Sequence, residues 1–303
     1  MIFGNISLLN FILKSYILEK YILLQMLKKG KNMNISKKLP LDSLVNTRDL
    51  GGIKTKDGKE IKKDLIFRSG KLNKCSDIDI KNLYENHNLR TIIDFRTEHE
   101  NGQSPDRLYK DMVRIANPIL TETQMGITRE EKEAIRPSNL IFVKRILSQE
   151  GRSGLEFMKG LYLNFIENDF CTAQYANFIR LLISENNGSI LYHCSVGKDR
   201  VGTGTIILLS LLGVEQKDIL QDFILTNEYI EPEIQKEIKE LSKNIEDPRL
   251  EETYRDLFSV RIAYGEALIN YISSNFGSFD NYRKVVLKIT DEEVELLKNK
   301  YLV

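Results

Sequence analysis

The stretch from residue 189 to residue 213 constrains the fold more than any other part of the chain. A short apolar strand leads into His193 and Cys194, and an apolar helical run follows at 205–212. Gly213 is the expected C-cap of that helix. The link between strand and helix is short and contains glycine. A strand, a tight loop and a helix in this order are typical of an α/β protein.

The loop from Cys194 to Arg200 has the composition of a phosphate-binding site. Loop N–H groups and the positive end of a helix dipole point at one spot, where an arginine can hold two phosphate oxygens at once. The same positive field favours a thiolate, which is a nucleophile for phosphoester hydrolysis. We therefore expect Cys194 to be the nucleophile and Arg200 to bind the phosphoryl group. The rest of the phosphate site is expected to comprise Ser195, Val196, Gly197, Lys198 and Asp199.

Two further residues of this segment have expected supporting roles. His193 directly precedes the thiol, so we expect it to orient the loop through a buried hydrogen bond and to tune the thiolate. Lys198 adds a second cation, which suits a substrate with more than one phosphate. The alternative is that Lys198 is an ordinary solvated lysine.

Strands and helices alternate along the first two thirds of the chain. Residues 65–68 and 91–94 are predicted strands, as is the segment that ends at Cys194, and 76–86 is a predicted helix capped at its start by Ser76 or Asp77. This alternation predicts an α/β fold with a central, mainly parallel sheet flanked by helices. Asp94 and Cys194 both end strands, so we expect them at the same crevice.

The sequence divides into an N-terminal segment, 1–35, and one catalytic domain, 36–303. Within that domain, 119–160 is too long for a simple loop and is predicted to be a helical insertion. It is either a lid over the site or a surface insertion. Residues 215–260 are helical and highly charged, and we expect most of them to form a solvated face.

The N-terminal segment is apolar with a basic flank. Residues 1–40 contain seven lysines and one glutamate, but charges interrupt the apolar run before it reaches the length of a spanning helix. A secretory signal also fits poorly, because no basic start or small-residue cleavage site is present. Membrane-surface contact through residues 1–32 is one hypothesis. The alternatives are a helix packed on the domain, or a gene start placed too early, with Met26 or Met33 as the true beginning.

Composition excludes several classes of function. The net charge of the 303 residues is +1, so no basic field favours nucleic acid as a partner. The three cysteines are far apart and predict neither a disulfide framework nor a zinc site. A reducing compartment suits them, so we expect a cytoplasmic protein, with a membrane-associated or secreted location as the alternative.

Several motifs together resemble one known family. The sequence His-Cys-Ser-Val-Gly-Lys-Asp-Arg at 193–200 is similar to the catalytic loop of the atypical bacterial tyrosine/serine phosphatases, which include secreted phosphatases of mycobacteria and Listeria. Further segments match that family in order. They are Asn-Thr-Arg-Asp-Leu-Gly-Gly at 46–52, Phe-Arg-Ser-Gly-Lys-Leu at 67–72, Ile-Asp-Phe-Arg-Thr at 93–97 with Glu100, and Asp-Phe-Ile-Leu-Thr-Asn at 222–227.

The resemblance, which covers about residues 40–303, implies a Cys-phosphatase-like fold and a cysteine-based phosphomonoesterase. Such an enzyme forms a phosphocysteine intermediate and needs no metal and no cofactor. Members of the family act on phosphotyrosine, often on phosphoserine or phosphothreonine, and some on phosphoinositides. The partner is then a phosphorylated protein or a phosphoinositide. A phosphate-binding pseudo-phosphatase is a third reading.

Hydrolysis also needs a general acid to protonate the leaving oxygen. By resemblance to the family, Asp199 is one candidate, and Asp94, at the end of the neighbouring strand, is the other; a residue of the insertion is the third option. Each aspartate has a structural alternative as the ion-pair partner of a nearby arginine. Arg48 and Arg68 either line the pocket or hold Asp49 and Asp94.

One position departs from the family pattern. The residue after the loop arginine is usually Thr or Ser, whose hydroxyl stabilises the cysteine as it leaves the phosphoenzyme. Here it is Val201, whose side chain has no hydroxyl group to donate a hydrogen bond. Thr203 or Ser195 can take its place; otherwise we expect slow breakdown of the phosphocysteine.

Overall fold

The computed structural model describes residues 33–122, 139–148 and 153–303. Within this part of the chain, residues 35–303 form one compact unit. The N-terminal segment 1–32 lies outside the described residues, as do 123–138 and 149–152, which make up much of the expected insertion at 119–160. The hypotheses about membrane contact and about a lid therefore stay predictions.

The centre of this unit is a six-stranded mixed sheet in the order β1-β2-β3-β6-β4-β5. Strands β3, β6, β4 and β5 are parallel, and β1 and β2 join the edge of β3 in antiparallel fashion. The prediction of a mainly parallel sheet is confirmed. The bounds of the strands are β1 Lys37–Lys38, β2 Arg48–Asp49, β3 Ile66–Ser69, β4 Leu89–Asp94, β5 Val113–Ala116 and β6 Ser189–His193.

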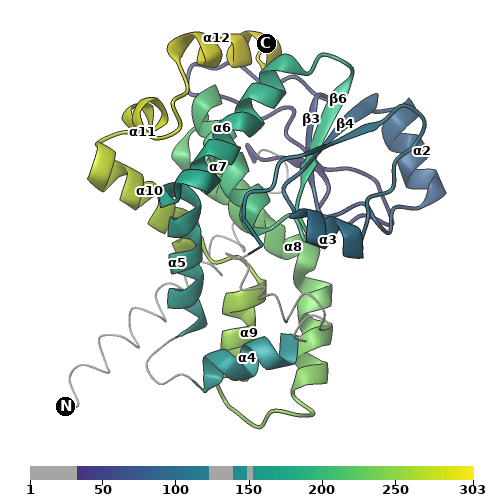
Figure 1. Ribbon diagram of the computed structural model, residues 1–303, viewed down its shortest axis with the longest axis vertical. Coiled ribbons are helices and arrows are strands. Elements are labelled where there is room, and N and C mark those ends of the chain that lie inside the picture. Colours follow the sequence, from purple (N-terminus) through teal and green to yellow (C-terminus); the bar gives the residue numbers. More distant parts are fainter. Residues whose placement is uncertain (1–32, 123–138, 149–152) are drawn as a thin grey trace. The chain divides into compact units, whose positions relative to one another are not determined.

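Eleven helices surround the sheet in the described part of the chain, and Figure 1 shows α2 on one side of it and α6 and α7 on the other. Their bounds are α2 Asp77–Glu85, α3 Glu98–Gln103, α4 Asn139–Leu147, α5 Gly154–Glu167, α6 Asp169–Ser184, α7 Asp199–Leu212, α8 Gln216–Leu241, α9 Leu250–Phe258, α10 Ile262–Phe276, α11 Phe279–Val285 and α12 Asp291–Tyr301. The α/β fold with flanking helices is therefore as predicted.

Strand β6 is apolar and continuous because both of its faces are covered. Leu191 belongs to the buried cluster beneath α2, which also contains Phe67 and Leu83. The next residue, Tyr192, points to the opposite face, and its ring centroid lies 4.8 Å from that of Phe178 in α6. A parallel strand with helices on both sides loses the polar alternation of a half-exposed strand.

Local capping signals fix the ends of three helices near the site. Ser76 accepts a hydrogen bond from the Asp79 amide at 3.1 Å and caps α2, as predicted. Gly213 ends α7 with φ +87°, as predicted. Thr97 and Glu100 form a capping box at the start of α3, which fixes the Glu100 side chain beside the loop that follows β6.

The expectation that residues 215–260 form mostly a solvated face is wrong for the first half of α8. Phe223, Ile224 and Leu225 are buried there, and Asp222 is fully buried between arginines. The charged residues of α8 lie on both sides of Pro232, and most of those that follow it are exposed. Beyond it, α9 packs against both α4 and α5 (Figure 1). In the described ranges, no helix combines the length and apolarity needed to cross a membrane.

Candidate active site

Cys194 lies at the carboxyl edge of the sheet, where β6 ends and the loop to α7 begins. In the pairing of the parallel strands β4 and β6, Asp94 is opposite His193, and the Phe95 amide donates to the His193 carbonyl at 2.9 Å. The two strand ends are therefore neighbours, as the sequence predicts. Cys194 is nearly buried, with 3% of its surface exposed, and α7 starts five residues later at Asp199.

The backbone carbonyl groups at the start of the loop are hydrogen-bonded to neighbouring segments. Four successive carbonyls, at residues 194–197, accept hydrogen bonds from groups beyond the loop. The Cys194 carbonyl accepts from His193 Nδ1 at 3.0 Å, and the Ser195 carbonyl accepts from the Lys71 amide at 3.3 Å. The Val196 carbonyl accepts from Asn46 Nδ2 at 3.3 Å. The Gly197 carbonyl accepts from Asn46 Nδ2 at 2.9 Å and from Arg68 Nη2 at 3.0 Å.

This arrangement fixes the direction of the loop amides. In a trans peptide the N–H points away from the C=O, and no cis peptide bond occurs in the described chain. The N–H groups of residues 195–198 therefore face away from the carbonyl partners. Successive N–H groups turned to one side form a concave site for an anion, next to the N-terminus of α7.

Gly197 is the residue that lets the loop turn in this way. Its φ is +76°, and a Cβ at this position would lie 2.5 Å from the Ser69 carbonyl oxygen. Only glycine combines this backbone conformation with so close an approach to β3. The sequence places a glycine at the one loop position where a side chain does not fit.

Arg200 is held by the carboxylate of Glu100. Its two terminal nitrogens donate to the two oxygens of Glu100, at 2.6 and 3.0 Å, and Nη2 also lies 3.3 Å from Ser195 Oγ. Burial alone would raise the pKa of Glu100, but the hydrogen bond and charge of Arg200 outweigh it and hold the pKa at about 2. Arg200 is buried as well, and Glu100 outweighs that burial to raise its pKa.

The Asp199 carboxylate is partly open to solvent. Its side chain is 26% exposed, and Oδ1 accepts a hydrogen bond of 2.8 Å from the phenol of Tyr162 in α5. The Lys198 ammonium lies 3.5 Å from the same oxygen and donates to the Leu257 carbonyl at 2.6 Å. Lys198 is therefore neither solvated nor directed freely at a ligand, because its charge is buried against the end of α9.

Asp94, the other candidate acid, is fully buried. Oδ1 accepts from the backbone amide and from Nε of Arg96, each at 2.9 Å, and Oδ2 accepts from Arg96 Nη2 and Arg114 Nε, also at 2.9 Å. Both oxygens are thus occupied by guanidinium groups. Asp94 is therefore the ion-pair partner of nearby arginines, which is the alternative to its role as general acid.

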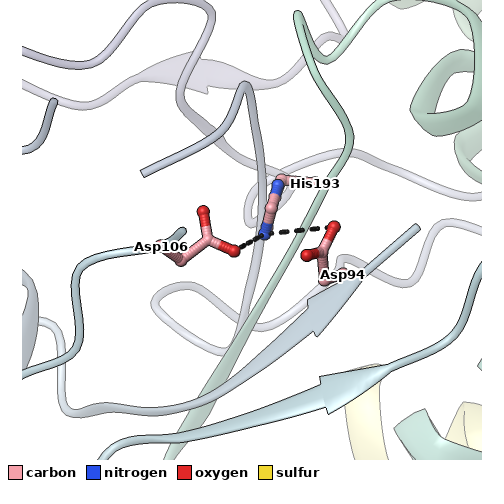
Figure 2. Close-up of side chains that lie close together, drawn as sticks. All are labelled: Asp94, Asp106 and His193. Atoms are coloured by element: carbon pink, nitrogen blue, oxygen red, sulfur yellow. Dashed lines mark ion pairs between the residues drawn. The ribbon is translucent and has the colours of Figure 1, made fainter. Parts of the chain in front are cut away.

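Figure 2 shows Asp94, Asp106 and His193 converging, with Nε2 of His193 directed at the two carboxylates. Nε2 lies 3.0 Å from Asp106 Oδ2 and 3.7 Å from Asp94 Oδ1. Burial would raise the pKa of Asp106, but His193 and Arg96 outweigh it and hold the pKa at about 2. The three residue types suit a metal ion, but Arg96 already contacts both carboxylates, so the cluster is an ion-pair network that orients His193.

Arg48 and Arg68 do not pair with Asp49 or Asp94, which corrects the expectation for these residues. Both arginines are fully buried and share Asp222 of α8, at 3.5 Å for Arg48 and 2.8 Å for Arg68. Asp49 instead accepts from the backbone amides of Gly51, in its own turn, and of Asp64. Arg68 reaches the site only through the Gly197 carbonyl, so its role is to support the loop.

Five residues around the loop were not assigned roles from the sequence: Asn46, Glu100, Asp106, Tyr162 and Asp222. Three of them, Asn46, Glu100 and Asp222, lie in segments that resemble the phosphatase family, so a signal for them was present. Asp106 and Tyr162 lie outside those segments, and only the fold places them beside His193 and Asp199.

The chain is similar to known phosphatases over most of its length. The model of the "Tyrosine phosphatase family" matches residues 39–303. A protein of Cupriavidus necator named "Putative tyrosine-protein phosphatase" is 26% identical over 265 residues, which are 87% of this chain and 88% of that protein. A "Tyrosine-protein phosphatase" of Nostoc commune is 22% identical over 262 residues, or 86% of this chain and 74% of that protein. The narrower likeness to the mycobacterial and Listeria enzymes stays a prediction, but the chain belongs to the tyrosine phosphatase family.

Proposed function

We propose that the protein hydrolyses phosphate monoesters by attack of the Cys194 thiolate and formation of a phosphocysteine. The observation that carries this proposal is the orientation of the loop: its carbonyls at 194–197 are bound from outside, so its amides face the opposite side. Amides preorganised in this way stabilise a phosphoryl group without reorganising during the reaction. Cys194 stands at the start of that same loop.

In the first step, Cys194 Sγ forms a bond to phosphorus while the bond from phosphorus to the leaving oxygen breaks. Arg200 and the loop amides bind the non-bridging oxygens. A carboxylic acid gives its proton to the departing oxygen, which leaves as an alcohol or phenol. In the second step the resulting carboxylate takes a proton from water, the water oxygen bonds to phosphorus, and the thiolate leaves.

Asp199 is the better supported general acid. It adjoins the phosphate-binding loop, its side chain is partly exposed, and Tyr162 and Lys198 both contact it through Oδ1. Asp94 is fully buried, and its oxygens are engaged by Arg96 and Arg114. A fully buried carboxylate whose two oxygens are already bound by guanidinium groups is not placed to meet a leaving group.

The lack of a hydroxyl at Val201 supports slow breakdown of the phosphocysteine. It is fully buried and offers no hydroxyl. Ser195, which follows Cys194 in the chain, donates its hydroxyl hydrogen to Glu100 at 2.7 Å, so that hydrogen is already in use. Thr203 is fully buried within α7. Rapid-mixing kinetics with an aryl phosphate should show a burst of phenol followed by a slower steady rate; a linear onset would refute slow breakdown.

The substrates that fit best are phosphotyrosine residues of proteins, with phosphoserine and phosphothreonine as further candidates. Two relatives are named as tyrosine-protein phosphatases. A phosphoinositide substrate is favoured in the sequence by Lys198 and by the basic N-terminal segment. The Lys198 ammonium is bound to the Leu257 carbonyl, and residues 1–32 lie outside the described part of the chain. All three cysteines are free, so the site suits a reducing compartment such as the cytoplasm.

Turnover of p-nitrophenyl phosphate in the presence of EDTA tests the proposal. We expect the wild type to turn over without added metal and Cys194→Ser to lose activity. Cys171→Ser is the matched control, because that thiol is buried in α6 outside the loop, and it should retain activity. Phosphate binding without turnover in the wild type would instead identify a pseudo-phosphatase.

A further inference from the structure

The phenol of Tyr162 reaches the catalytic loop from a distant part of the chain. Its hydroxyl donates to Asp199 Oδ1 at 2.8 Å, although 37 residues separate the two in sequence. Burial, followed by the charge and hydrogen bond of Asp199, raises the pKa of Tyr162 well above its ordinary value. The phenol therefore keeps its proton and acts as the donor in this pair.

An aromatic cluster holds the Tyr162 ring in one position. The ring stacks on Tyr264, with centroids 5.2 Å apart and planes 24° apart. Phe165 and Phe223 meet it edge-on, at centroid distances of 5.8 and 5.7 Å. Tyr162 is fully buried, and a side chain packed on several sides keeps one rotamer. The position of the Tyr162 hydroxyl is therefore fixed, and its hydrogen bond can orient the Asp199 carboxylate.

Within the described part of the chain, the Asp199 carboxylate makes its contacts through one oxygen, Oδ1. Tyr162 binds Oδ1, and the Lys198 ammonium lies 3.5 Å from the same atom. Oδ2 is left to carry the transferred proton. When Oδ2 is protonated, Oδ1 becomes the carbonyl oxygen of the acid and still accepts from the phenol, so the same hydrogen bond persists in both protonation states.

We propose that Tyr162 is a positioning residue for proton transfer: it fixes Oδ1 of Asp199 so that Oδ2 faces the leaving oxygen of the substrate. This inference rests on the proposed role of Asp199 as general acid. A fixed acid matters most where the leaving group departs poorly, because a good leaving group needs no proton as its bond to phosphorus breaks. That dependence separates positioning from a merely structural hydrogen bond.

The test compares kcat/KM for phenyl phosphate, a poor leaving group, with kcat/KM for dinitrophenyl phosphate, a good one. This parameter reports the steps up to departure of the leaving group, so slow phosphocysteine breakdown does not hide the effect. For Tyr162→Phe we expect a loss of about tenfold with phenyl phosphate and less than about twofold with dinitrophenyl phosphate. Tyr162→Phe keeps the ring and its packing, so the variant should fold, which far-UV circular dichroism checks.

Two companion variants interpret the result. Tyr282→Phe is the matched control, because the buried Tyr282 hydroxyl donates to the Ile166 carbonyl of α5 and not to the loop. It should be unchanged with both substrates. Asp199→Asn should show the same selectivity as Tyr162→Phe, but a larger loss. If Asp199→Asn is selective and Tyr162→Phe is not, the positioning role of Tyr162 is overturned and the proposed function stands. If Asp199→Asn impairs both substrates equally, the general acid is misassigned and this inference falls with it.

Discussion

Replacement of Glu100 by glutamine should destabilise the folded protein and misplace Arg200. Each carboxylate oxygen faces two donors: Oε1 accepts from Arg200 Nη2 and Ser195 Oγ, and Oε2 accepts from Arg200 Nη1 and the Thr97 amide. A glutamine amide has one nitrogen that cannot accept. At the position of Oε2 that nitrogen meets two donors, and at the position of Oε1 it meets Arg200 Nη2, so either orientation leaves a donor without an acceptor in a buried site.

The expected loss follows from the pKa of Glu100. A fall from its ordinary value of 4.5 to about 2 corresponds to roughly 3 kcal/mol of stability, which is similar to the ~3–5 kcal/mol for breaking a buried ion pair. Because the folded-state pKa is lowered, this stability is fully present above about pH 4.5 and is lost as the pH falls towards about 2.

The assay is urea unfolding followed by far-UV circular dichroism, because the chain has no tryptophan. At neutral pH, Glu100→Gln should lower the free energy of unfolding by about 3 kcal/mol, and the difference from wild type should shrink as the pH drops below about 4.5. The control is Glu98→Gln on the same helix. Its carboxylate is 63% exposed and pairs with Arg114 at the surface, so the cost should be less than ~0.5 kcal/mol. A loss below ~1 kcal/mol at neutral pH, or a loss that does not change on acidification, would refute the reasoning.

Further variants test the support of the loop and the role of Val201. Gly197→Ala should abolish activity and cost roughly 2–4 kcal/mol in urea unfolding, whereas Gly213→Ala, with similar φ and open space around it, should cost only about 1–2 kcal/mol and keep activity. Asp222→Asn should lower the free energy of unfolding by about 3–5 kcal/mol because it leaves two buried arginines short of a partner; unchanged stability would contradict the buried network. Val201→Thr should shrink the pre-steady-state burst and speed turnover, and an unchanged burst would show that a hydroxyl at this position is not what limits phosphocysteine hydrolysis.

The parts of the fold that local sequence determines could be predicted. Strand β6 reads as a continuous apolar run because helices cover both of its faces, and the ends of α2 and α7 follow from Ser76 and Gly213, which act on the backbone next to them. The glycine at 197 and the arginine at 200 belong to the same local unit. Each of these signals lies within one turn or strand of the structure that it determines.

The partners of the buried charges could not be predicted, because they depend on packing between distant segments. Asp222 lies 154 residues from Arg68, and Glu100 lies 100 residues from Arg200. From the sequence alone, Asp49 and Asp94 are the expected ion-pair partners of Arg48 and Arg68, and the charged composition of 215–260 predicts a solvated helix. Tertiary contacts overrode both expectations, since a buried guanidinium needs whichever carboxylate the fold brings to it.

Direct observation of the phosphoenzyme is the most direct test of the central claim. The wild type is mixed with an aryl phosphate, quenched in acid within the burst, and its peptides are mapped by mass spectrometry. We expect one phosphoryl group on the peptide that contains Cys194, and none on the same peptide from Cys194→Ser. Turnover with no phosphopeptide, or with the phosphoryl group on another residue, would contradict a mechanism through phosphocysteine at Cys194.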